Sequence, residues 1–301
     1  MSLSFSQFAV KCSAQLEEDG RFSTARLYLN ALRSFAGFIR CSEVQFTDFT
    51  RKRLIAYEHE LRYHSYCPNT ISTYMRMLRA IYNKGVDAGL APFVHRLFHD
   101  VYTGIDISRR RALDFKDLKT LICGRTEKPS LRRTQKICAS LYSLCGMSFV
   151  DFMNVDFSTV KGGVLTYCRH KTGTSISISV MKRTMKLIGD INVPRSDMRT
   201  SRGYRLYQSR LRRFNSSISR LALSLGITSP VSSYTLRHSW ATAALRRHVP
   251  IELISAALGH RSIRTTQIYL SGFSAAEIGA ATVRSAAILK QSSNQELEAD
   301  R

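Results

Sequence analysis

The sequence lacks long apolar runs, and this shortage excludes two classes of protein. No stretch approaches the roughly 18 uninterrupted apolar residues that a membrane-spanning helix needs. The first twenty residues contain acids where a signal peptide would have its apolar segment. We therefore expect neither an exported nor a membrane-embedded protein.

Cysteine pairs are also missing. The seven cysteines are odd in number and widely scattered, and no two form a CxxC pair. This pattern is typical of reduced thiols and indicates neither a disulfide framework nor a zinc site. The best candidate for a metal-ligand pair is His95 with His99, but the acid of an HExxH motif does not accompany them. We predict no bound metal and no other cofactor.

Acidic residues are scarce relative to basic ones. The chain has 22 Asp and Glu against 45 Lys and Arg, a formal charge of +23, of which +3 falls within residues 1–107 and +20 beyond them. Such an excess repels itself unless a polyanion offsets it. The sequence shows no basic amphipathic helix beside a lipidation signal, so the charge favours nucleic acid over an anionic membrane.

The N-terminal part, residues 1–105, predicts a small helical domain. Apolar side chains recur at helical spacing over 22–41, 47–65 and 69–88, which suggests a bundle of about four helices. Arg76 and Arg79 stand among tyrosines in the last of these helices. That mixture suits a DNA-facing surface, and it equally suits an ordinary exposed helix face.

A basic linker is expected next, over residues 106–113, because this stretch has no periodicity and contains Arg109, Arg110 and Arg111. The three arginines are candidate DNA contacts at a hinge between two domains, or simply a solvated linker. The second domain, 114–301, predicts a mainly α fold with a small β-sheet. Strands at 164–168 and 175–180 form a hairpin through Gly173, and 192–205 forms a surface loop. The expected helices are 114–123, 131–146, 207–226, 233–247, 250–258, 262–270 and 274–290.

The most informative stretch is 234–269. It contains Tyr234-Thr-Leu-Arg237-His238, then Leu258-Gly259-His260, then Tyr269 nine residues later. Taken singly, each of these residues is weak evidence for chemistry. In this order and spacing they resemble the second half of the catalytic motif of the tyrosine recombinase (phage integrase) family. The strings GMSFVDF, RHSWAT and GHRSIRTTQIYL are similar to the branch found on Bacteroidetes mobile elements and DNA invertases.

The resemblance implies a core-binding (SAM-like) helical domain, a catalytic domain with an early β-hairpin, and a role for each motif residue. Arg237 would clamp the scissile phosphate. His260 would bond the same phosphate or help the nucleophile lose its proton. Tyr269 would attack phosphorus to form a 3′-phosphotyrosyl link, and Lys171, on the hairpin turn, would protonate the leaving 5′-oxygen. Because the link conserves the bond energy, neither ATP nor a metal is required.

Two departures from the family pattern stand out. Tyr234 replaces the usual histidine, and its phenol can still bond a phosphate. The first catalytic arginine is missing: Ser148 occupies its place, with Asp151 matching the acid three residues on. In the related branch an arginine often stands where this chain has Cys145.

Losing one of two phosphate-clamping arginines removes several kcal/mol of transition-state stabilisation unless another group replaces it, since one oxyanion donor contributes about 3–4 kcal/mol. Arg132, Arg133 and Arg169 are the candidate substitutes. We also expect Arg169 and the adjacent His170 to touch phosphate or solvent, which makes Arg169 a candidate DNA contact.

These observations predict a metal- and ATP-independent site-specific DNA recombinase, for DNA inversion or for integration and excision of a mobile element. By resemblance, its partner is double-stranded DNA with inverted-repeat core sites. It would act as a homotetramer tied together by exchange of helix 274–290, which is otherwise a core helix. The expected location is the bacterial cytoplasm, at the nucleoid. Two alternatives stay open: a DNA-binding relative with impaired catalysis, and a type IB-like topoisomerase.

Overall fold

The computed structural model describes residues 3–106, 112–191 and 197–270. For residues 268–270 only the backbone is described. Contacts divide the chain into two compact units, one of Met1–Asp106 with Ser196–Arg210 and the other of Ile107–Arg195 with Leu211–Arg301. The expected linker arginines Arg109, Arg110 and Arg111 and the expected helix 274–290 lie outside the described residues.

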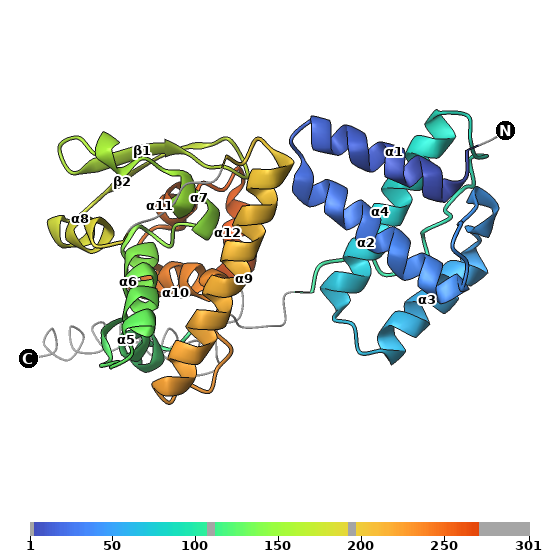
Figure 1. Cartoon of the computed structure of the whole chain (residues 1–301). Helices are drawn as coiled ribbons and strands as arrows, with labels where there is room; N and C mark the ends of the chain where they lie inside the picture. Colours follow the sequence, from blue (N-terminus) through green and yellow to red (C-terminus); the bar gives the residue numbers. More distant parts are fainter. Residues whose placement is uncertain (1–2, 107–111, 192–196, 271–301) are drawn as a thin grey trace, which may run out of the picture. The chain divides into compact units, whose positions relative to one another are not determined.

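The first unit is a helical bundle (Figure 1). Over residues 3–106 the α-helices are α1 (Phe5–Glu18), α2 (Phe22–Ile39), α3 (Arg51–Tyr63) and α4 (Pro68–Asp87). The last three correspond to the expected helices. The predicted start of the second at residue 47 is wrong, because a short 3-10 turn (Phe46–Asp48) ends there and Thr50 caps α3 by accepting a hydrogen bond from the Arg53 N–H.

The helix α1 was not individually predicted, although its sequence carries a recognised start signal. Ser4 and Gln7 form a capping box, in which each side chain bonds the other residue's backbone N–H. Phe5, Phe8 and Cys12 then recur at helical spacing on the buried face. The helix therefore buries a stripe against α2 and α4, its two neighbours in the bundle.

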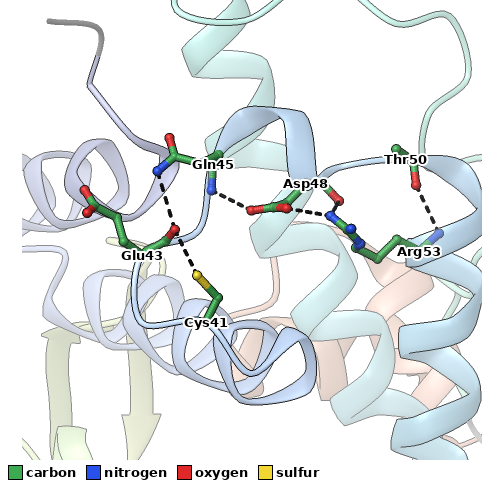
Figure 2. A network of polar contacts seen from close by, with 6 residues as sticks. All are labelled: Cys41, Glu43, Gln45, Asp48, Thr50 and Arg53. Carbon is green, nitrogen blue, oxygen red and sulfur yellow. Dashed lines mark hydrogen bonds and ion pairs between the residues drawn. The ribbon is translucent and has the colours of Figure 1, made fainter.

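A polar turn joins α2 to α3 (Figure 2). The Gln45 N–H donates to an Asp48 carboxylate oxygen at 2.8 Å, and Arg53 forms an ion pair with the same carboxylate at 2.5 Å. The Glu43 carbonyl accepts bonds from the Cys41 thiol and the Gln45 amide. These local bonds satisfy the backbone where helix geometry is interrupted between α2 and α3.

The second unit is also mainly helical, with a two-stranded sheet, so the predicted fold class is confirmed. Two helices were not anticipated, α7 (Phe149–Asn154) and α8 (Lys182–Gly189). The remaining elements, which follow the predicted order, are α5 (Phe115–Cys123), α6 (Pro129–Ser143), β1 (Val164–Cys168), β2 (Ser175–Ser179), α9 (Ser201–Ser224), α10 (Ser233–Arg246), α11 (Ile251–Leu258) and α12 (Ile263–Leu270), together with a 3-10 turn (Phe157–Thr159). Of α9, only the part from Leu211 onwards belongs to the second unit.

The hairpin of β1 and β2 is antiparallel, with Val164 opposite Ser179 and Cys168 opposite Ser175. Its side chains alternate between an exposed and a buried face, as the sequence pattern predicted. The buried face packs on α11. This contact brings the hairpin turn close to the C-terminal end of that helix, where the candidate site lies.

The expected surface loop 192–205 is wrong for residues 201–205, which begin α9. Thr200 explains the early start: its hydroxyl accepts the Gly203 N–H at 3.0 Å, and its carbonyl accepts the Tyr204 N–H. The threonine therefore acts as an N-terminal cap. The polar, arginine-rich composition of this stretch belongs to an exposed helix.

No helix within the described residues is long and apolar enough to cross a membrane. All seven cysteines lie in the described ranges, and no disulfide joins any two of them.

Candidate active site

Arg237 stands at the centre of the candidate site, one turn into α10. Ser232 and Thr235 form a capping box that fixes the start of this helix. The Arg237 side chain is 2% exposed. Its Nη1 donates to the Gly146 carbonyl at 3.0 Å and its Nη2 to the Leu258 carbonyl at 2.5 Å. Two segments that are distant in sequence, around Gly146 and Leu258, thus bind the Arg237 guanidinium.

Gly146 allows the backbone to approach Arg237 this closely. Its φ is +65°, a left-handed conformation that favours glycine. A Cβ at this position would lie 3.0 Å from the Arg237 Cα and 3.2 Å from the Trp240 Cβ. The adjacent Cys145 also has positive φ, at 56°, and burial raises the pKa of its thiol. Its side chain is therefore a neutral thiol near pH 7 and supplies no cation to the site.

His260 lies beside Arg237, with its Nε2 3.4 Å from Nη2 of the arginine. Its Nδ1 is 2.8 Å from the hydroxyl of Thr266, a buried residue of α12. Arginine nitrogens only donate, so Nε2 must offer its lone pair and Nδ1 carries the proton to Thr266. Burial, then the charges of Arg237 and Arg169, lower the pKa of His260 to about 3. The imidazole is therefore neutral, with an acceptor nitrogen facing the arginine.

The hairpin turn is fastened to the loop that carries His260. Gly259 ends α11 in a left-handed conformation, and its carbonyl accepts bonds from Arg169 Nη1 at 2.8 Å and from the Thr172 hydroxyl at 3.3 Å. Arg261 in turn donates to the Thr172 carbonyl. These contacts hold the exposed Lys171, in the middle of the turn, close to His260.

Arg169 is 7% exposed, so of its two expected contacts, phosphate or solvent, bulk solvent hardly reaches it in this structure. It continues the inward positions of β1, following Leu165 and Tyr167 at a spacing of two. His170, one position later, is exposed as expected. Arg76 and Arg79, the other described DNA-contact candidates, are exposed on α4.

Ser148, at the place of the family's first arginine, caps the N-terminus of α7. Its hydroxyl accepts the Asp151 N–H at 3.3 Å and donates to the Asp151 carboxylate at 2.6 Å. The other oxygen of that carboxylate accepts the His170 N–H at 2.8 Å. Ser148 and Asp151 therefore bond each other, and Asp151 also bonds the hairpin turn. The sequence pattern around Ser148 does not reveal this contact with the turn.

Tyr234 stands one turn before Arg237 on α10 and is 39% exposed, with its ring edge-on to that of His238 at 4.7 Å. Tyr269 lies on α12, the helix that supplies Thr266, and its side chain lies outside the described residues. The elements α10, α11 and α12 contact one another (Figure 1). The structure thus brings Arg237, His260 and the Lys171 turn together.

Sequence reasoning missed two contributors, Thr266 and Thr172, which orient the imidazole and fasten the turn. Neither carries a motif signal, because a threonine on a helix or in a turn is common. Among the described residues no group of three or more His, Cys, Asp or Glu side chains is arranged to hold a metal ion. The described side chains at this site include those of Arg237, the neutral His260, Lys171 and Tyr234.

Comparison with known families agrees with the motif. Residues 111–274, more than half of the chain, match the model of the Phage integrase family. Residues 4–95 match the model of the Phage integrase SAM-like domain. The two models therefore cover the second unit's site and most of the helical bundle.

Individual relatives match over short segments. An Escherichia coli protein named Integrase/recombinase is 40% identical over 72 residues, which are 24% of this chain and 20% of that protein. Tyrosine recombinase XerD of Mycobacterium leprae is 50% identical over 44 residues, which are 15% of this chain and 14% of the relative. Each match thus spans a fifth or less of the relative's length.

Solved structures share the fold over most of the chain. A lambda integrase dimer bound to a COC′ core site has a TM-score of 0.65 at 14% identity, covering 90% of this chain and 78% of that chain. XerH recombinase bound to its difH substrate has a TM-score of 0.57 at 15% identity, covering 94% of this chain and 85% of that chain. At such identities the likeness is one of fold.

Proposed function

The chain belongs to the phage integrase family, and we propose that it is a site-specific tyrosine recombinase that cuts and rejoins double-stranded DNA through a 3′-phosphotyrosyl intermediate. One observation carries this most directly. The buried Arg237 and the half-buried His260, 23 residues apart in the chain, lie side by side at a loop that also holds the Lys171 turn. A cationic, preorganised cluster of this kind suits a developing phosphoryl charge.

Each side chain has a distinct task. Arg237 binds non-bridging oxygens of the scissile phosphate, and Tyr234 adds a phenol donor at its rim. The Tyr269 oxygen attacks phosphorus, the phosphorus–5′-oxygen bond breaks, and the leaving oxygen takes a proton from Lys171. A neutral His260 with its acceptor at Nε2 can receive the tyrosine's proton. Rejoining runs the same steps backwards with another strand's 5′-hydroxyl.

The bond energy stays in the phosphotyrosyl link during this sequence, so strand exchange consumes neither ATP nor a metal ion. In domain terms, residues 1–105 bind the core site, 106–113 link the domains and 114–301 hold the chemistry. The exposed Arg76 and Arg79, with Arg109, Arg110 and Arg111, contact the DNA backbone. The +20 charge of residues 108–301 supplies the electrostatic attraction.

The biological substrate is inverted-repeat core sites, and the outcome is inversion of a segment or integration and excision of a mobile element. Among similar structures, a lambda integrase dimer is bound to a COC′ core site and XerH recombinase to a difH substrate. Four copies of the chain assemble on two sites, tied by exchange of 274–290. The protein acts at the nucleoid in the bacterial cytoplasm.

Covalent trapping tests the reaction. Wild type, Tyr269→Phe and the control Tyr63→Phe, which changes an exposed tyrosine of the first unit, are incubated in EDTA with nicked substrates made from inverted repeats flanking the gene. We expect a DNA–protein adduct on a denaturing gel with wild type and control, and none with Tyr269→Phe.

A binding protein without catalysis is the second candidate, favoured by the commitment of Ser148 to capping α7 where the family has an arginine. It predicts a salt-sensitive gel shift on the same DNA with no adduct from any variant. Relaxation of supercoiled plasmid lacking any core site would instead favour a topoisomerase.

A further inference from the structure

We propose that Arg169 is the second phosphate-binding arginine of the site and stands in for the missing first one. This inference rests on the proposed recombinase function and deepens it. The ligand is one scissile phosphodiester, shared between Arg169 and Arg237. Arg169 acts by donating N–H bonds to a non-bridging oxygen, and it neither gains nor loses a proton.

The first observation is proximity through a shared backbone. Arg237 Nη2 binds the Leu258 carbonyl and Arg169 Nη1 binds the carbonyl of the next residue, Gly259. Consecutive Cα atoms are about 3.8 Å apart, so the two guanidiniums lie at one short piece of chain. His260 follows directly and touches Arg237.

The second observation is that two buried arginines form no ion pair within the described part of the chain, although the charge of Asp151 acts on Arg237 from nearby. Among the described ion pairs none involves Arg169 or Arg237. The Nε atoms of both are buried and have no acceptor in the described part of the chain. Burying an uncompensated charge or an unsatisfied donor is unfavourable. A phosphate, whose charge rises from −1 to −2 in the pentavalent transition state, would supply both the missing charge and the missing acceptors.

Electrostatics agrees with this geometry. Burial lowers the pKa of Arg237 to about 10, and the positive charge of Arg169 is the next largest cause. The same two arginines also lower the pKa of His260. These repulsions agree with two cationic arginines and an ionisable His260 close together, and an anion bound there would relieve the repulsion between the arginines.

The other candidate substitutes are in the wrong place. Arg132 and Arg133 are exposed near the start of α6, and Arg132 donates to the Glu127 carbonyl beside it. The residues at the expected positions, Cys145 and Ser148, carry no guanidinium. Arg169 alone among these residues is buried at the Arg237 cluster.

Arg169 also has a structural contact, since it holds the Gly259 carbonyl, and the test must separate the two roles. Thr172→Val is the matched control, because the Thr172 hydroxyl bonds the same carbonyl without carrying charge. Arg132→Ala controls for general loss of positive charge. Thermal melting of every variant verifies folding, and Arg169→Lys keeps the charge while removing the planar fork.

The experiment is single-turnover cleavage of two nicked substrates, one with the natural scissile phosphate and one with a neutral methylphosphonate in its place. On the natural substrate we expect Arg169→Ala to cleave about 10²- to 10³-fold more slowly than wild type and Arg169→Lys to fall between them. On the methylphosphonate, which has no oxygen charge to neutralise, the loss shrinks to within about tenfold. Thr172→Val should slow cleavage by the same factor on both substrates.

Two results would overturn the assignment: Arg169→Ala cleaving the natural substrate as fast as wild type, or losing equally on both substrates as Thr172→Val does. In both cases wild type still forms its adduct, so recombinase chemistry stands and only the role of Arg169 falls. Absence of any wild-type adduct would instead reject the recombinase function, and the clamp with it.

Discussion

The two units bury different kinds of side chain. The first has an aromatic core in which Phe35 contacts the rings of Phe38, Phe49 and Tyr57. Its buried carboxylate, Glu58, is satisfied by Arg62 and by the Tyr102 N–H. The second unit buries Arg169 and Arg237 with donors left over. The first unit's buried polar group therefore serves the fold, whereas the second holds polar capacity for a ligand.

This contrast follows from the energetics of burial. A satisfied buried charge adds little net stability, and an unsatisfied one lowers it. The second unit keeps Arg169 and Arg237 in place with backbone carbonyls and the neutral His260, which hold the side chains without neutralising them. Substitutions in the two units should accordingly separate stability from chemistry.

The largest effect is expected at Arg237. Arg237→Ala should slow covalent cleavage by at least about 10³-fold, because it removes a donor pair to the developing phosphoryl charge. Single-turnover cleavage measures this, with Arg132→Ala as the exposed control. A loss matched by Arg132→Ala would contradict a local role.

Next comes the core of the first unit. Phe35→Ala should reduce the free energy of unfolding by about 3–5 kcal/mol, since it leaves a cavity among packed rings. Denaturant unfolding measures the loss. Below the melting temperature of the variant, the cleavage rate of the bound complex should stay at the wild-type value. A slower chemical step would contradict the assignment of stability to the first unit and of chemistry to the second.

A glycine pair sharpens the comparison. Gly20 in the first unit and Gly146 in the second both have left-handed backbones, with φ of +71° and +65°. A Cβ at Gly20 meets no atom within 4 Å, whereas one at Gly146 meets the backbone of Arg237. Gly20→Ala should therefore destabilise by about 1 kcal/mol and leave cleavage intact. Gly146→Ala should destabilise by about 3 kcal/mol and slow cleavage.

Equal effects of the two alanines, in both melting and cleavage, would show that backbone conformation alone matters at these positions and that Gly146 does not position Arg237.

The last expected effect is a pH dependence of stability. The pKa of His260 is about 3 when folded and 6.5 in the unperturbed group. Between these values the unfolded chain binds more protons, so the free energy of unfolding falls as the pH drops from 6.5 towards 3. Denaturant unfolding at pH 7, 5 and 4 measures the slope. His260→Gln should flatten it, and the exposed His59→Gln should not; an unchanged slope in His260→Gln would assign the dependence to other groups.

Much of the local structure was predictable. Helical spacing located most of the helices, because burying one face of a helix leaves a period in the sequence. The alternation over 164–168 located the hairpin, and adding one more inward position, two residues after Tyr167, would have placed Arg169 inside. The helix α9 was predicted too short, since its first turn has the polar composition of a loop and starts from a threonine cap.

The sequence by itself determined the helix and strand types, the charge asymmetry and the order of Arg237, His260 and Tyr269 along the chain. Only the tertiary structure decided which arginines meet. The bonds from Arg237 to Gly146 and from Arg169 to Gly259 span 91 and 90 residues. Local periodicity in the sequence carries no information on bonds between residues so far apart in the chain. The packing of α11 on the hairpin and of α6 on α10 brings these residues together.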